Sequence, residues 1–226
     1  MQQNNRLKAV IFDMDGVLFD TEKIYLDVWT KIFNKYGYKM TKEIYCKVIA
    51  TGRENVKKIF KEEFGENLPI EEMYKEKDIV LAKKLEKKIP IKNGACELLN
   101  YLKNKRYKLA LATSASRERM EKQLKESNFI RIFDEVVCRD DVTKTKPNPE
   151  IFLKVANKLK VSPEECIVIE DSAAGIEAAY KGNMTSIHVV DLKEADEKIK
   201  EYSHRSFNNL FEIKKYFRTV KNDICK

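Results

Sequence analysis

The chain has 226 residues, of which 44 are Lys or Arg and 36 are Asp or Glu, so its formal net charge at pH 7 is +8. Hydrophobic residues make up 43% of the chain, and this composition excludes intrinsic disorder. Only two histidines are present, which argues against histidine-rich zinc centres and multi-histidine metal sites. An enzyme of this composition would therefore rely on carboxylates and lysines.

Neither the cysteines nor the apolar residues indicate a secreted protein or a membrane protein. The five cysteines are scattered and form no CxxC pair, so we interpret them as reduced thiols that are mostly buried. The longest segment without charge, residues 182–190, is about half as long as the roughly 18 residues that a membrane helix needs. Residues 1–10 lack the apolar region of a signal peptide. We expect a cytoplasmic protein with no membrane partner.

The charge surplus raises the possibility of an anionic partner. The charged segments 57–63, 71–77 and 82–88 mix both signs, however, as solvated helix faces do. We therefore expect no nucleic-acid partner, and a lysine-rich surface that at most attracts anionic small molecules.

The first predicted element is a buried strand, residues 7–12, which ends at Asp13. Apolar residues at three- and four-residue spacing then predict a helix over 21–36, capped by Asp20 or Thr21 and stopped by Gly37. Further helices are predicted over 41–50, 53–64 and 69–88. Residues 21–89 are thus expected to be almost entirely helical.

From residue 90 onward, strands alternate with helices. The predicted strands are 107–112, 135–138, 166–169 and 184–189, and the predicted helices are 95–105, 116–127, 149–159, 172–180 and 210–217. This alternation predicts a parallel sheet with helical crossovers. We predict a doubly wound α/β core domain of residues 1–18 and 90–226, interrupted by a small helical domain of residues 19–89.

Polar side chains follow each of the first four predicted strands. They are Asp13 and Asp15, then Thr113 and Ser114, then a loop with Lys144 and Lys146, and finally Glu170 and Asp171. Ligands of open parallel sheets bind at the carboxyl ends of the strands, so we expect these side chains to gather there.

The spacing of Asp13 and Asp15 places both carboxylates on the same side of an extended chain. Two carboxylates about 4 Å apart repel by roughly 4 kcal/mol at an effective dielectric constant of 20, so the pair requires a proton or a cation. Oxygen ligands without His or Cys favour Mg²⁺. Thr113, Ser114 and Lys146 could then donate to a phosphate group.

Four motifs carry a resemblance to a known family. Residues 13–20, DMDGVLFD, resemble the DxDGxLxD signature of the haloacid dehalogenase superfamily, and Thr113 ends the second strand as that family's hydroxyl motif does. Residues 146–152, KPNPEIF, resemble its KPxPEIF motif, and residues 170–179, EDSAAGIEAA, resemble its EDSxxGIxAA motif. The four motifs follow one another along this chain in the same order as in the family. The resemblance implies a Rossmann-type core, and the helical insertion resembles the cap of the beta-phosphoglucomutase and sugar-phosphate phosphatase branch.

The resemblance implies a Mg²⁺-dependent phosphatase that acts on a small phosphorylated metabolite, a sugar phosphate in our interpretation, through an aspartyl-phosphate. Asp13 would be the nucleophile, and Asp15 the general acid and then the general base. Asp13, Asp15 and Asp171 would hold the metal, and Glu170 would support it through water or orient neighbouring residues. The residues expected to bind the transferring phosphoryl group are Thr113, Ser114 and Lys146.

In the helical insertion, the resemblance implies that Arg53 reaches the non-transferring part of an anionic substrate. Glu22 would bind a sugar hydroxyl. We expect a monomer whose cap opens and closes over the site.

Two alternatives remain. Beta-phosphoglucomutases share every core residue, but they carry a histidine shortly after the first motif, and the matching position here is Tyr25. This difference favours the phosphatase. A non-enzymatic binding module on the same scaffold would show no turnover and salt-sensitive RNA binding.

Overall fold

The computed structural model describes residues 7–49, 53–87 and 89–219. The chain divides into two compact units, which we call the core unit (Met1–Phe19 and Ile91–Lys226) and the helical unit (Asp20–Pro90). The boundaries drawn from the sequence lie one residue earlier at each junction.

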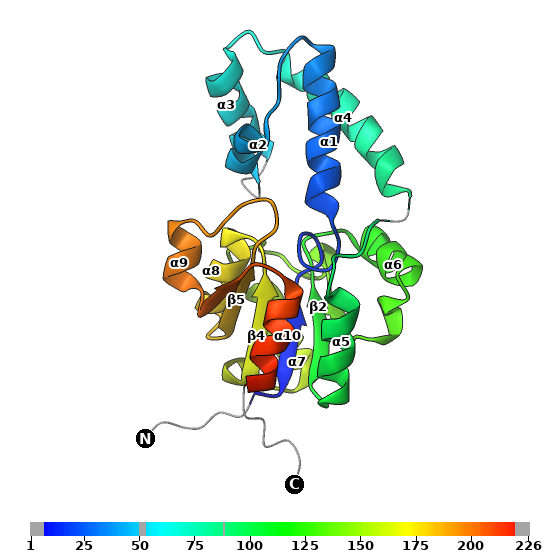
Figure 1. Cartoon of the computed structure of the whole chain (residues 1–226), viewed down its shortest axis with the longest axis vertical. Helices are drawn as coiled ribbons and strands as arrows, with labels where there is room; N and C mark the ends of the chain where they lie inside the picture. The colour runs from blue at the N-terminus through cyan, green and yellow to red at the C-terminus, as the bar shows by residue number, and fades with distance from the viewer. Residues whose placement is uncertain (1–6, 50–52, 88, 220–226) are drawn as a thin grey trace. The chain divides into compact units, whose positions relative to one another are not determined.

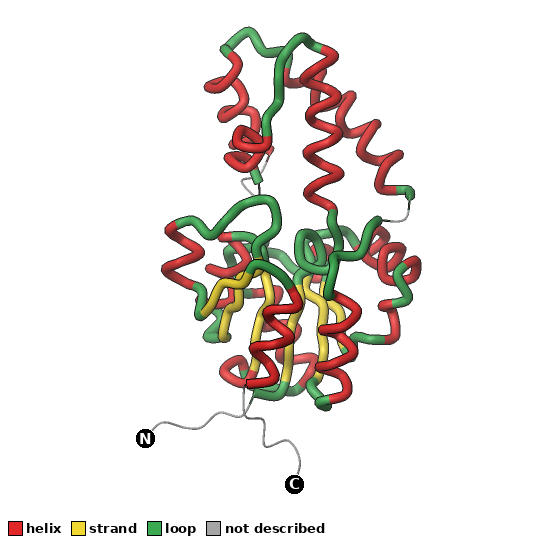
Figure 2. The backbone as a smooth tube through the Cα atoms, viewed as in Figure 1, coloured by secondary structure: helices red, strands yellow, loops and turns green. Residues whose placement is uncertain are grey.

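The core unit is built on a six-stranded parallel sheet with the strand order β3-β2-β1-β4-β5-β6. Figures 1 and 2 show this sheet with helices packed around it. The strands are β1 (Ala9–Phe12), β2 (Lys108–Ala112), β3 (Glu135–Val137), β4 (Cys166–Glu170), β5 (Thr185–Val189) and β6 (Arg205–Phe207). This order is that of a doubly wound α/β sheet, and it confirms the predicted fold class. The order reverses between β1 and β4, which is where such sheets bind their ligands.

Helices cover both faces of this sheet (Figure 1). They are α5 (Ala95–Asn104), α6 (Arg117–Glu126), α7 (Glu150–Leu159), α8 (Ala173–Lys181), α9 (Glu197–Tyr202) and α10 (Leu210–Thr219). All four residues of β1 are fully buried, and Ala9 and Ile11 pack in one cluster with residues of α7 and α8. A strand buried on both faces has no polar alternation, which explains the continuous apolar run in its sequence.

The predicted helices and strands of the core unit lie within two residues of their observed bounds. Ser116 and Ser172 explain two of the helix starts, because their hydroxyls accept hydrogen bonds from the backbone N–H groups of Arg119 and Gly175. No pattern in the sequence predicted α9 and β6. β6 is an edge strand whose Arg205 and Ser206 are exposed, so it carries no apolar run and depends on pairing with β5.

The helical unit consists of α1 (Thr21–Lys35), α2 (Lys42–Val48), α3 (Arg53–Phe64) and α4 (Ile70–Leu85). Its interior is aromatic. The ring of Trp29 lies edge-on to Phe60 and Tyr74, with centroids 5.2 and 4.9 Å apart, and Phe33 contacts Phe60 at 4.9 Å. Such edge-to-face pairs add to the stabilisation that burial alone provides.

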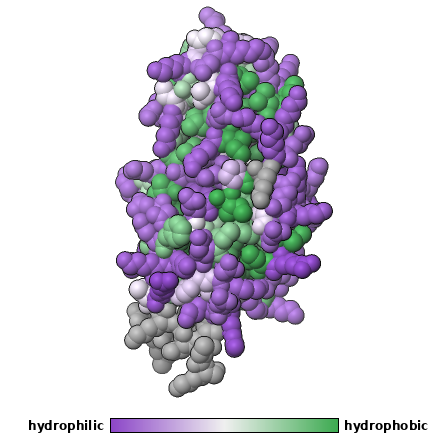
Figure 3. All heavy atoms as spheres, turned by 45° about the vertical axis from the view of Figure 1, so that its right-hand side comes forward, coloured by the Kyte–Doolittle hydropathy of each residue, from purple (hydrophilic) through white to green (hydrophobic). Residues whose placement is uncertain are grey.

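The surface of the described chain is strongly polar. Hydrophilic side chains cover most of the face in Figure 3, and ion pairs such as Lys47–Glu63 join opposite charges. None of the described helices has the length and apolar character needed to cross a membrane. Of the cysteines that the structure describes, Cys138 and Cys166 are buried and Cys46 is half-buried. Cys96 is exposed, so the expectation of mostly buried thiols holds for only part of this set.

Tyr107 directly precedes β2, and its buried side chain allows the packing of the core unit to be tested. Its ring packs edge-on against Phe217, but its buried hydroxyl has no hydrogen-bond partner among the described residues. Burial raises the pKa of Tyr107 to about 12. Below about pH 10 the hydroxyl is neutral in both states. As the pH rises from 10 toward 12, the free energy of unfolding falls, because the unfolded chain ionises first.

Replacing Tyr107 with phenylalanine is expected to raise the free energy of unfolding by about 1 kcal/mol at pH 7, because it removes an unsatisfied buried hydroxyl. The variant should also lose less stability than the wild type between pH 10 and 12. Urea denaturation at pH 7 and pH 11 measures both effects, with Tyr180→Phe as an exposed control. A lower stability at pH 7 would contradict this account of Tyr107.

Candidate active site

Asp13 and Asp15 follow β1 at the point where the strand leaves the sheet. The backbone N–H of Asp13 still donates to the carbonyl of Ile169 at 3.0 Å, so β1 and β4 remain paired up to this residue. The chain then turns at Gly16, whose φ of +76° is a left-handed conformation that suits glycine. The Gly16 N–H closes the turn onto the Phe19 carbonyl at 3.0 Å.

A buried ion-pair cluster joins the ends of β1 and β4. The Nζ of Lys146 lies 2.5 Å from Asp13 Oδ1 and 2.7 Å from Glu170 Oε1, and all three side chains are less than 10% exposed. The same Nζ donates to the carbonyl of Ala112, the last residue of β2, at 3.2 Å. Lys146 therefore connects three neighbouring strands. Lys144, by contrast, is exposed on the same loop.

Burial and the neighbouring charges act in opposite directions in this cluster. Burial is the largest cause that raises the pKa of Asp13, to about 7; Lys146 opposes it, and the nearby Glu170 and Asp15 carboxylates add to it. Burial also works to lower the pKa of Lys146, but Asp13 and Glu170 outweigh it and raise that pKa above its ordinary value. Lys146 therefore stays cationic, while the surrounding carboxylates remain in excess.

Glu170 is held toward Lys146 by its own surroundings. Its Oε2 accepts hydrogen bonds from the backbone N–H and the hydroxyl of Ser172, at 2.8 and 2.9 Å. A Cβ at Gly175 would lie 1.8 Å from Glu170 Oε1, so only glycine leaves space for this carboxylate. The sequence left two roles open for Glu170, support of a metal through water or orientation of neighbouring residues. In the structure its oxygens contact Lys146 and Ser172 directly.

Asp171 lies against the turn that follows β1. A Cβ at Gly16 would lie 2.1 Å from Asp171 Oδ2, which shows how closely this carboxylate approaches the Gly16 backbone. The end of β4 therefore places Asp171 beside the turn that carries Asp15. At the switch point between β1 and β4, the carboxylates of Asp15 and Glu170 interact electrostatically with Asp13, and Asp171 lies beside Gly16.

Thr113 and Ser114, which follow the last residue of β2, differ in burial. Thr113 is fully buried, its backbone N–H donates to the carbonyl of Val137, and its hydroxyl accepts from the N–H of Ala115 at 3.0 Å. A hydroxyl that accepts one hydrogen bond can still donate its own proton. The side chain of Ser114 is exposed.

Two cations that the sequence motifs did not predict, Arg119 and Lys92, lie at the turn after β1. Arg119 Nη2 donates to Asp15 Oδ1, and Lys92 Nζ donates to the Gly16 carbonyl and to Asp191 Oδ1, both at 2.6 Å. A weak signal for Arg119 was its place in the first turn of the helix after the second strand. No signal in the sequence pointed to Lys92, because 76 residues separate it from Gly16.

Arg53 and Glu22 lie in the helical unit and contact other residues of that unit. The guanidinium of Arg53 lies 4.4 Å from the ring centroid of Tyr74 and 3.5 Å from Asp78 Oδ2. Glu22 Oε2 accepts a hydrogen bond from the Tyr45 hydroxyl at 2.6 Å. Their contacts with a substrate remain a prediction.

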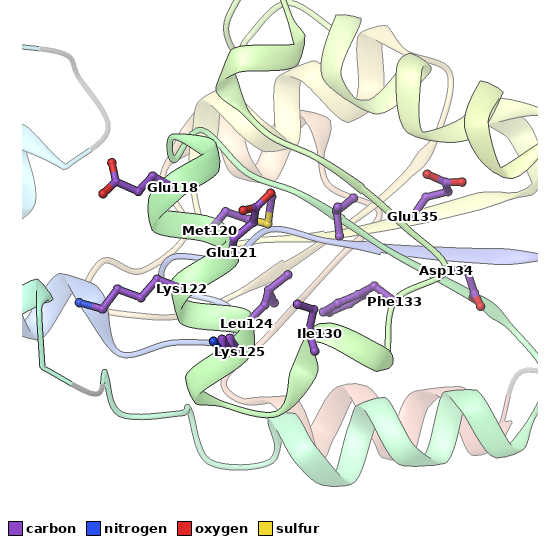
Figure 4. Close-up of a pocket in the computed structure, with 11 residues that line it drawn as sticks. Glu118, Met120, Glu121, Lys122, Leu124, Lys125, Ile130, Phe133, Asp134 and Glu135 are labelled. Atoms are coloured by element: carbon purple, nitrogen blue, oxygen red, sulfur yellow. The ribbon is translucent and has the colours of Figure 1, made fainter.

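A separate hollow of about 520 Å³ lies on the core unit (Figure 4). Apolar side chains from α6 and from the segment after it contribute to its lining, namely Met120, Leu124, Ile130 and Phe133, with charged residues around them. All of its lining residues fall within the segment 118–136. The hollow is thus distinct from the cluster of carboxylates at the strand ends.

The donor set at the strand ends suits a hard divalent cation. Lys146 pairs with Asp13 and Glu170, and Arg119 pairs with Asp15. Burial is the main cause of the raised pKa of Asp13, and the carboxylates of Glu170 and Asp15 add to it, whereas Lys146 opposes it. Among the described residues, no group of three His, Cys, Asp or Glu side chains is arranged to hold a metal ion. Mg²⁺ does not need such a group, because it is held by one or two carboxylates together with water and phosphate oxygens.

Comparison with known proteins agrees with this arrangement. The profile of the family described as haloacid dehalogenase-like hydrolase matches residues 10–189, which include every motif at the strand ends. The chain belongs to the haloacid dehalogenase-like hydrolase family. The resemblance seen in the sequence motifs is thereby confirmed.

Relatives within this hydrolase family include enzymes of more than one activity. A phosphorylated carbohydrates phosphatase from Thermotoga maritima is 35% identical over 81% of this chain and 85% of its own length. The crystal structure of beta-phosphoglucomutase from Clostridium difficile is 25% identical, with a TM-score of 0.66 over 95% of this chain and 100% of that one. A family hydrolase from Deinococcus radiodurans shares the fold, with a TM-score of 0.82 at 21% identity over 93% of this chain and 94% of that one.

Proposed function

We propose that this hydrolase is a Mg²⁺-dependent phosphatase of small phosphorylated metabolites, sugar phosphates among them, and that it acts through an aspartyl-phosphate on Asp13. The observation that carries the proposal is the buried contact of Lys146 with both Asp13 and Glu170 at the switch point of the sheet. This contact supplies a fixed positive charge beside a buried carboxylate. The phosphatase activity of the Thermotoga relative supports the same reaction class.

In the proposed first step, a carboxylate oxygen of Asp13 attacks phosphorus and the bond from phosphorus to the ester oxygen breaks. Asp15 gives its proton to the departing oxygen, so the product leaves as an alcohol. In the second step, Asp15 takes a proton from water as the water attacks the phosphorus of the aspartyl-phosphate. Inorganic phosphate leaves, and Asp13 and the protonated Asp15 are restored.

Lys146, Thr113 and Ser114 are proposed to bind the phosphoryl group during both steps. Lys146 supplies a charge that is already desolvated, and the Thr113 hydroxyl can donate from the end of β2. The backbone N–H of Ser114, at the same strand end, would be a further donor. Donors held in place in this way stabilise the transition state without reorganising.

Asp13, Asp171 and the backbone carbonyl of Asp15 would hold Mg²⁺. When bound, the ion supplies positive charge for the phosphate oxygens. Glu170, bound to Lys146 and Ser172, would orient the lysine and support the ion through water. We also propose that the helical unit is a cap, in which Arg53 and Glu22 select the substrate, and that the protein is a cytoplasmic monomer.

The test is hydrolysis by purified protein of an aryl phosphate and of a panel of sugar phosphates, with free phosphate and isomerised product measured separately. We expect phosphate release that requires Mg²⁺, falls by at least about 10²-fold in excess chelator and returns when Mg²⁺ is added back. Unaltered turnover in chelator would contradict the metal role. Isomer without phosphate release would favour a mutase, and RNA binding without turnover would favour a binding module.

A further inference from the structure

Arg119 makes a contact that none of the family motifs contains. It lies in the first turn of α6, 104 residues from Asp15, and its Nη2 donates to Asp15 Oδ1. The Arg119 and Asp15 side chains are 23% and 26% exposed, so water only partly screens the pair. A charge-assisted contact in such a setting is stronger than a pair on the open surface.

The guanidinium of Arg119 is itself supported. Its Nε donates to Gln123 Oε1 at 3.1 Å, and Gln123, one turn further along α6, is 3% exposed. The start of α6 is fixed by Ser116, whose hydroxyl accepts from the backbone N–H of Arg119 at 3.4 Å. The orientation of the guanidinium is therefore set in part from its own helix, and its Nη2 donates to Asp15.

We propose that Arg119 is a positioning residue for Asp15, which holds Oδ1 so that Oδ2 carries the proton exchanged with the leaving group. This inference rests on the proposed function, because it requires Asp15 to transfer a proton. A carboxyl group without such support rotates about its side-chain bonds, and a misplacement of about 1 Å can cost about 10²-fold in rate. Arg119 limits that rotation.

Substrates with different leaving groups can reveal the positioning role of Arg119. A nitrophenolate leaves readily as an anion, whereas the oxygen of an alkyl or sugar phosphate needs a proton as it departs. The second-order constant kcat/KM reports the steps up to release of the first product, and so it isolates the acid step from the later hydrolysis. Loss of Arg119 should therefore affect kcat/KM for alkyl phosphates far more than for the nitrophenyl ester.

The experiment compares kcat/KM for p-nitrophenyl phosphate and for an alkyl phosphate in Arg119→Met, Arg119→Lys and the wild type. We expect Arg119→Met to lose about 10- to 100-fold on the alkyl ester and less than about 3-fold on the nitrophenyl ester. On the alkyl ester, kcat/KM of Arg119→Lys should lie between the values of Arg119→Met and the wild type. Lysine keeps the charge but lacks the planar guanidinium that reaches Gln123. Arg131→Met, an exposed arginine, is the matched control.

A double-mutant cycle distinguishes positioning from direct substrate contact. In an Asp15→Asn background, Arg119→Met should change kcat/KM for the alkyl ester by less than about 2-fold. A further loss as large as that in the wild type would mean that Arg119 binds substrate, and it would overturn the proposal. An equal loss on both esters in Arg119→Met would do the same.

Measurements on a second variant and on the wild type distinguish failure of this inference from failure of the proposed function. Gln123→Met leaves Arg119 in place but removes its support, so it should lower kcat/KM selectively on the alkyl ester even if Arg119→Met does not fold. If Gln123→Met has the same kcat/KM as the wild type on each of the two esters, the inference is overturned. Wild-type protein that hydrolyses no phosphate ester would overturn the proposed function and this inference with it.

Discussion

Replacing Asp13 with asparagine is expected to lower kcat by about 10⁴- to 10⁶-fold, because loss of a nucleophile costs the whole covalent pathway. The variant should still fold. Asparagine has nearly the same shape, and Lys146 keeps Glu170 as its counter-charge at 2.7 Å. The substitution also removes one of the carboxylates that crowd the end of β1. Steady-state phosphate release and circular dichroism measure the two outcomes.

The matched control is Asp140→Asn. Asp140 is exposed and accepts a hydrogen bond from the backbone N–H of Arg117, which an asparagine oxygen can also accept. This control should keep the wild-type rate. The wild type should incorporate phosphate covalently when its reaction is quenched with acid, and Asp13→Asn should not. A folded Asp13→Asn protein with a rate near that of the wild type would exclude Asp13 as the nucleophile.

The sequence was informative where local chemistry determines the structure. An apolar run buried on both faces predicts β1, and polar side chains at successive strand ends predict which side chains meet at the switch point. Asp13, Glu170 and Lys146 could be grouped in this way, because a parallel sheet aligns its strand ends. The helix starts at Ser116 and Ser172 follow from the same kind of local rule.

Contacts between distant segments were not predictable from the sequence. The reach of Arg119 to Asp15 depends on where α6 starts after β2, and the contact of Lys92 with Gly16 depends on how the chain returns after residue 90. Glu170 shows the same limit. Its position at the end of β4 was foreseen, but its direct contact with Lys146 depends on the space that Gly175 leaves.

Replacing Lys146 with methionine is expected to reduce both turnover and stability. The buried carboxylates of Asp13 and Glu170 would lose their shared cation, and breaking a buried pair costs about 3–5 kcal/mol in the free energy of unfolding. Turnover should fall by about 10²- to 10³-fold, because a preorganised positive charge at the phosphoryl group is lost. Urea denaturation and phosphate release measure these changes, with the exposed Lys144→Met as the control from the same loop.

A second substitution distinguishes the two effects of Lys146. Adding Glu170→Gln to Lys146→Met removes one uncompensated carboxylate and keeps an acceptor for the Ser172 N–H and hydroxyl. The double variant should therefore recover part of the lost stability, because the charge left unpaired in the core is smaller. It should not recover turnover, since no cation has returned to the phosphoryl site. Recovery of both would mean that Lys146 acts on catalysis only by keeping the core folded, whereas recovery of stability alone would assign its charge to the reaction.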